Sequence, residues 1–134
     1  MINMTLQDPD FYISEMINEC YLISKGVRSA YMTSLILTEY DEADIEANEQ
    51  IIQELQDTAN SDGLIFSIAE YPREKDDMPD RRYYRIWVLK YPHQLKIVDN
   101  LYKLDRCMRK YVMGKLLGYS DESMEEFMSK NYPD

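Results

Sequence analysis

The sequence predicts an α+β fold, with a small sheet that contains an antiparallel strand pair, helices that cover this sheet, and a helical C-terminal third. Two compact runs of Ile, Val, Phe, Tyr and Trp, residues 64–71 and 83–91, flank the charged loop 72–82 and are typical of paired strands. Elsewhere, apolar residues recur every three or four positions, as in amphipathic helices. With 45% hydrophobic and 30% charged residues, the chain has a globular composition.

The N-terminal half predicts a helix, a strand and a second helix. After Asp8-Pro9-Asp10, apolar residues at helical spacing indicate a helix that ends near Gly26: Phe11, Ile13, Met16, Ile17, Cys20 and Ile23. Residues 30–38 carry no charge and favour a strand, with a helix as the alternative. Asp41 can cap the second helix, whose apolar stripe is Ile45, Ile52, Leu55 and Ala59.

The C-terminal third predicts helices that follow the second strand of the pair. Tyr91-Pro92 ends this strand, because proline has no amide to donate to a ladder and suits the first turn of a helix. Residues 93–117 form one helix, or two that are broken near 103–105, with an apolar face at Leu95, Val98, Leu101, Leu104, Met108, Tyr111, Val112 and Leu116. Gly118 then ends the helix, and Ser120 caps a short last helix that buries Met124, Phe127 and Met128. We also expect Trp87, or its neighbours Ile86 and Val88, to pack under helices.

Length and cysteine content limit the number of domains and the cellular location that can be expected. The 134 residues suit one domain, 1–134, with a core of its own. Cys20 and Cys107 form neither a CxxC motif nor a Cys/His cluster, so a reducing, cytoplasmic location is expected. Neither a signal peptide nor a run of about 18 apolar residues is found, and no membrane partner is expected.

No combination of residues specifies a reaction. His93 is the only histidine, and its place between Pro92 and Gln94 is more typical of a local cap or an exposed polar group than of a general base. The four glycines form neither a P-loop nor a GxGxxG turn. The acid-rich groups near 41–44 and 76–80 lack the spacing of metal ligands. We therefore expect no enzyme, no cofactor and no metal.

The acidic charge is concentrated in the first half of the chain. The formal net charge is −10, and residues 1–62 alone hold 13 acids against Lys25 and Arg28. Acids dominate the second predicted helix, and they form the candidate protein-binding surface: Asp41, Glu42, Asp44, Glu46, Glu49, Glu54 and Asp57. A partner protein with a basic surface would meet a focused negative face here. The simpler interpretation is a solvated helix face.

The stretch 81–115 has the opposite character, with ten bases against Asp99 and Asp105. Cations beside Tyr83, Tyr84 and Trp87 suit phosphate contact combined with base stacking, so nucleic-acid binding is the alternative function. Its candidate residues are Arg81, Arg82, Arg85, Arg106, Arg109 and Lys110. The net charge of −10 opposes this alternative unless the two charges are well separated in space.

The segment 114–122, GKLLGYSDE, together with Trp87 and Tyr91-Pro92-His93, resembles small uncharacterised proteins of phages and prophages of Gram-positive bacteria. The resemblance implies a viral accessory or host-interaction role in the cytoplasm of a bacterial host, and transfers no catalytic residue. The resulting prediction is a non-enzymatic protein-binding module, a phage-type inhibitor of a host or defence protein that acts through its acidic surface. The partner and the oligomeric state, a homo-oligomer included, are left open.

Overall fold

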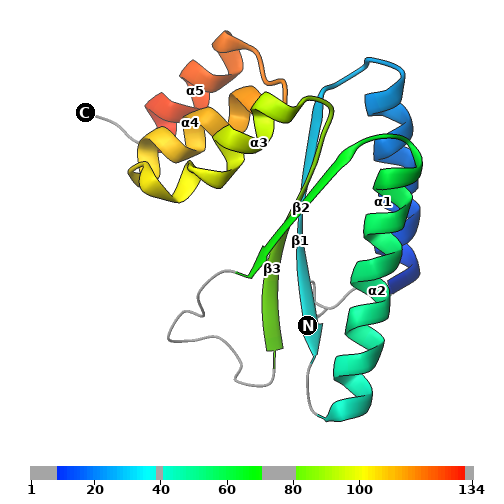
Figure 1. The fold of residues 1–134 in the computed structure, drawn as a ribbon. Coiled ribbons are helices and arrows are strands. Elements are labelled where there is room, and N and C mark those ends of the chain that lie inside the picture. Colours follow the sequence, from blue (N-terminus) through cyan, green and yellow to red (C-terminus); the bar gives the residue numbers. More distant parts are fainter. Residues whose placement is uncertain (1–8, 39–40, 71–80, 132–134) are drawn as a thin grey trace.

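The computed structural model describes residues 9–38, 41–70 and 81–131 (Figure 1). In chain order the elements are α1 (Pro9–Ser24), β1 (Ala30–Thr38), α2 (Glu42–Ser61), β2 (Ile65–Glu70), β3 (Arg81–Leu89), α3 (Pro92–Asp99), the 3₁₀ helix η1 (Leu101–Lys103), α4 (Arg106–Leu116) and α5 (Asp121–Asn131). This is the predicted α+β fold with a helical C-terminal third. The strand at 30–38 is confirmed over its predicted length. The loop predicted at 72–82 lies mostly outside the described residues.

The three strands form an antiparallel sheet in the order β1-β3-β2. The strand pair predicted from 64–71 and 83–91 is confirmed as β2 and β3, in a register that places Ile65 opposite Leu89. The structure adds that β3 also pairs along its whole length with β1, where Ala30 lies opposite the same Leu89. Because β3 is antiparallel to both neighbours, β1 and β2 run in the same direction, and α2 connects them past the central strand.

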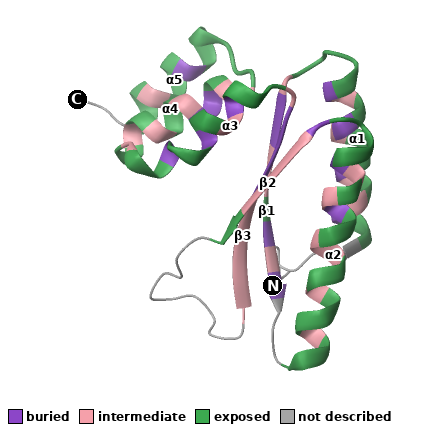
Figure 2. Cartoon of the chain, in the orientation of Figure 1, coloured by how far each residue is buried: buried purple, intermediate pink, exposed green. Residues whose placement is uncertain are grey.

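The sheet buries one core on each face. Successive side chains of a strand point to opposite faces. Ile86 and Val88 of β3 accordingly join the core under α1 and α2, whereas Trp87 and Leu89 join the core under α3, η1 and α4. All four residues are buried, as predicted for Trp87 and its neighbours. Figures 1 and 2 show that α1 and α2 lie along one side of the sheet, while α3, α4 and α5 gather at one end of the other side.

The helix pair α1 and α2 departs from the predicted stripes at three positions. Met16, Cys20 and Ile23 are buried as expected, but Phe11 and Ile17 are about half exposed, since the buried face of α1 includes Tyr12 instead. Ile45 of α2 is 39% exposed because the stripe becomes buried only at Leu55 and Ala59, closer to the C-terminal end of α2. The N-cap prediction is confirmed, since the Asp44 amide donates to Asp41 Oδ1 at 2.9 Å.

Of the two alternatives for residues 93–117, the structure has two helices. Asp105 ends the connection and caps α4, accepting from the Met108 amide at 2.9 Å. Gly118, at φ +88°, forms the turn before α5, and the Ser120 hydroxyl accepts from the Ser123 amide. Met124 of α5 is buried against Gly114 of α4, where any Cβ would overlap its thioether.

Three of the apolar side chains predicted to be buried on the C-terminal helices are substantially exposed. They are Met108 and Tyr111 of α4 and Phe127 of α5. The described helices leave this side of the α4–α5 pair open, because α5 covers α4 mainly where Gly114 allows the close approach of Met124. Helical spacing predicts which residues can share a face, and the number of neighbouring elements then decides how much of that face is covered.

The core under α1 and α2 contains two groups with altered ionisation. Tyr31 donates its hydroxyl to Glu15 Oε1 of α1 at 2.5 Å, and burial together with this hydrogen bond raises the pKa of Tyr31. Burial is also the main reason that the pKa of the Cys20 thiol rises from 9.0 to about 11. A cysteine in this state is a protonated, shielded core residue rather than a nucleophile at neutral pH.

Candidate functional site

The predicted acidic residues all belong to the N-cap and the length of α2. At about 100° per residue, Glu42, Glu46, Glu49 and Asp57 project within a common outward stripe. All four are exposed. Glu54 points to the side of this stripe, and Asp44 points toward the half-buried side of the helix. The structure therefore brings together four of the seven candidates, which we call the acidic stripe.

The predicted basic residues of β3 divide between the two faces of the sheet. Arg82 shares its face with Ile86 and Val88, and its guanidinium forms an ion pair with Glu70 of β2 at 3.4 Å. Arg81 and Arg85 share the face of Trp87, on which α3 and α4 lie. Arg81 stands at the start of the strand, about 13 Å along β3 from Arg85. Only Arg85 of the three thus meets the C-terminal cations.

Arg85 lies opposite the first two turns of α4, and the two elements enclose a cleft of ≈ 560 Å³. We call it the basic cleft; its lining residues are Arg85, Arg106, Arg109, Lys110 and Met113. Arg106, Arg109 and Lys110 come together because α4 places residues three and four positions apart on one side. No carboxylate of the described residues lines the cleft. Four of the six predicted basic candidates therefore converge on one concavity, although 20 residues separate Arg85 from Arg106.

Tyr102 of η1 holds two of these cations in place. Its hydroxyl accepts a hydrogen bond from Arg85 Nη1 at 3.2 Å, and its ring centroid lies 5.9 Å from the Arg85 guanidinium carbon and 5.3 Å from that of Arg109. Both distances suit cation–π attraction, which offsets part of the repulsion between two like charges. Arg109 Nε is buried and has no hydrogen-bond partner within the described part of the chain. The wall of the site therefore holds a guanidinium with one buried donor that no described residue satisfies.

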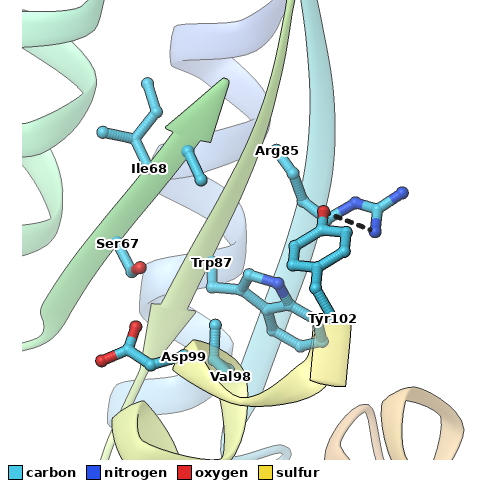
Figure 3. Close-up of a pocket in the computed structure, with 8 residues that line it drawn as sticks. Ser67, Ile68, Arg85, Trp87, Val98, Asp99 and Tyr102 are labelled. Atoms are coloured by element: carbon cyan, nitrogen blue, oxygen red, sulfur yellow. Dashed lines mark hydrogen bonds between the residues drawn. The ribbon is translucent and has the colours of Figure 1, made fainter. Parts of the chain in front are cut away.

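A smaller hollow of ≈ 150 Å³ adjoins the basic cleft, and Arg85 lines both (Figure 3). We call it the Trp87 pocket; it is lined by Ser67, Ile68, Ala69, Arg85, Trp87, Val98, Asp99 and Tyr102. Figure 3 shows the indole of Trp87 at the centre, with Ser67 and Asp99 to one side and Tyr102 to the other. The wall combines apolar surface with the hydroxyls of Ser67 and Tyr102, the guanidinium of Arg85 and the carboxylate of Asp99.

Reasoning from the sequence did not select Tyr102, Asp99 or Met113 as site residues. Tyr102 follows the break between α3 and α4, so its direction depends on the 3₁₀ turn and not on a helical repeat. Asp99 is an acid inside a basic stretch, and only the packing of α3 on β3 shows that it borders a pocket. The sequence did offer one signal for Tyr102, because it is an aromatic residue next to Lys103 within the basic stretch 81–115, and aromatic residues among cations are common in nucleic-acid sites.

His93 and groups of metal-ligating side chains are the remaining candidates for chemistry. His93 is exposed at the start of α3 and stacks on Tyr91, with ring centroids 5.5 Å apart. Within residues 9–38, 41–70 and 81–131, no three His, Cys, Asp or Glu side chains are grouped as metal ligands. In the same ranges, no helix has both the length and the apolar character needed to cross a membrane.

Comparison of the chain with protein families, with curated proteins and with solved structures found no match.

Proposed function

We propose that the protein is a non-enzymatic binding module that holds single-stranded nucleic acid in the basic cleft. The observation that carries the proposal is the convergence of four cations from β3 and α4 on one concavity that no described carboxylate lines. Phosphates are the anions that such a group of arginines and lysines suits best, because a guanidinium binds two phosphate oxygens at once.

A single strand fits the site better than a duplex does. Tyr102 is 49% exposed beside the cations, so an unstacked base can contact its ring. The α4–α5 pair lacks the chemistry of a helix-turn-helix, since α5 carries Asp121, Glu122, Glu125 and Glu126 against Lys130 and would repel a phosphate backbone. These features favour an extended strand that places phosphates in the cleft and bases against the aromatic rings.

The negative net charge is compatible with this function because the two charges lie on opposite sides of the sheet. The acidic stripe belongs to α2, which packs with α1 on one face, whereas the basic cleft opens on the face that carries α3 and α4. Charges separated by more than a Debye length, about 8 Å at physiological salt, are largely screened from each other. A strand bound in the cleft would feel mainly the local cations.

The direct test is a salt titration with a fluorescently labelled oligothymidylate, followed by anisotropy. If four cations replace counterions on a single strand, log K should fall with log salt with a slope of about −3, given roughly −0.7 per phosphate. A protein that shows no binding at low salt, or binding that does not depend on salt, would contradict the proposal. Unlabelled duplex of the same length serves as competitor and should compete less well.

A second proposal concerns the acidic stripe, which is favoured by the alignment of Glu42, Glu46, Glu49 and Asp57 on one exposed face. In this proposal the acidic stripe binds a basic surface of a partner protein, as expected from the sequence for an inhibitor of the phage type. Electrostatic complementarity of this kind acts mainly on association rate and specificity.

The test is to reverse Glu42, Glu46 and Glu49 to Lys and to measure binding to an oligolysine peptide. Reversal of Glu122, Glu125 and Glu126 on α5 adds the same charge elsewhere and is the matched control. Weaker peptide binding in the α2 variant alone supports the stripe, whereas equal losses in both variants mean that only net charge matters. If the basic cleft binds nucleic acid, both reversals should also tighten oligonucleotide binding at low salt by a few fold.

A further inference from the structure

We propose that the Trp87 pocket receives one base of the bound strand and selects guanine. The inference rests on the proposed function and goes further, because it assigns base recognition to Asp99 and the packed indole of Trp87. Arg85 lines both hollows, so a nucleotide whose phosphate lies in the basic cleft has its base at the mouth of the Trp87 pocket.

The size and walls of the pocket suit one planar ring. Its volume of ≈ 150 Å³ equals the share of about five water molecules in the liquid, which is the scale of a single heterocycle and not of a sugar–phosphate chain. Trp87 is held rigidly by the core under α3 and reaches the pocket only with the 2% of its surface that is exposed, and Val98 and Ala69 add apolar surface. A base in this pocket would exchange water for aromatic and aliphatic contacts.

Asp99 supplies the selectivity. Its side chain is exposed at the pocket and makes no hydrogen bond or ion pair with the residues that the structure describes. It is also the last residue of α3, where the helix dipole disfavours a negative charge. No partner among the described residues accounts for a carboxylate at this position, which leaves its acceptor oxygens available for a ligand.

A carboxylate only accepts hydrogen bonds, through two oxygens that match a pair of parallel N–H donors. The Watson–Crick edge of guanine presents two adjacent donors, the ring N–H and the amino group, whereas each of the other bases presents a single donor group there. A paired contact of this kind discriminates against the wrong base by about tenfold or more. The neighbouring Ser67 hydroxyl can both donate and accept, so it does not oppose this preference.

The experiment compares oligothymidylate with the same strand carrying one central guanine, adenine or cytosine. Trp87 is the only tryptophan, so its fluorescence reports directly on the pocket while anisotropy reports on the whole complex. We expect the guanine strand to bind about tenfold tighter than oligothymidylate and to quench Trp87. Asp99→Asn should remove the guanine preference while oligothymidylate still binds. Glu122→Gln, which removes a charge on α5 away from the pocket, should keep the preference.

The outcomes separate base selection in the pocket from strand binding in the cleft. If all four strands bind equally and with a salt slope near −3, the cleft binds nucleic acid but the pocket does not select a base, and the inference is overturned alone. Base selection by Asp99 is likewise overturned if Asp99→Asn keeps the guanine preference. If no strand binds at low salt, both proposals fall.

Discussion

Replacing Arg85 and Arg109 together with glutamine is expected to weaken oligonucleotide binding by at least about 10²-fold, because each hydrogen bond to a charged group contributes about 1.5 to 3 kcal/mol. These are the two cations that Tyr102 holds between β3 and α4. The salt dependence should fall in parallel, since two fewer phosphates are neutralised and the slope becomes shallower by about 1.4. Anisotropy over a range of salt concentrations measures both quantities.

The matched control for this double variant is Lys96→Gln with Lys103→Gln. Both lysines are exposed, belong to the same basic stretch and lie outside the residues that line the cleft. The control therefore changes the net charge by the same amount without altering the cleft, and a loss of only a few fold is expected. Equal losses in the two double variants would show that the protein attracts nucleic acid by its overall field alone. Because Arg85 and Arg109 pack on Tyr102, thermal unfolding should be measured for each variant.

The largest effect on stability is expected at Ile86, which is fully buried at the centre of the sheet under α1 and α2. Ile86→Ala should lower the free energy of unfolding by about 2 to 5 kcal/mol, because the cavity collapses only partly between two helices and a strand. For a chain of this size the melting temperature should fall by about 6 to 20 °C. Circular dichroism during heating measures the change.

Ile97→Ala is the control for the core substitution, since it removes the same atoms from a side chain that is 40% exposed on α3. A change within about 1 kcal/mol is expected there. If Ile86→Ala were no more harmful than Ile97→Ala, the core between the sheet and the α1–α2 pair would not exist as described.

Local signals in the sequence were sufficient for most elements and for the β2–β3 pair, and insufficient for the rest of the assembly. Asp41, Ser120 and Gly118 mark helix ends through short-range hydrogen bonds and backbone conformation, and each acts in the structure as its residue type predicts. The pairing of β1 with β3 joins residues about 50 positions apart, and no local pattern specifies it. Phe11 and Ile17 illustrate the same limit, because helical spacing permits burial but the number of covering elements decides it.

The candidate site was predicted only in part, because its residues come together through packing between elements that are distant in the sequence. The basic stretch 81–115 includes every cation of the cleft, yet Arg81 and Arg82 lie elsewhere because a strand alternates its faces and only Arg85 is both on the right face and near α4. Tyr102 and Asp99 were missed because their positions follow from how η1 and α3 pack on β3. The acidic residues all belong to α2 and its N-cap, and helix geometry places four of the seven on one stripe.

The strand order has a consequence for synthesis of the protein on the ribosome. Both outer strands depend on β3 for their ladder hydrogen bonds, yet β3 is the last of the three to be made. At roughly 5 to 20 residues per second, about 3 to 10 s pass between completion of β1 and completion of β3. Throughout that interval the nine uncharged residues of β1 remain without a partner strand, which is the state most prone to intermolecular pairing. We therefore expect a chaperone to bind the nascent chain at this stage.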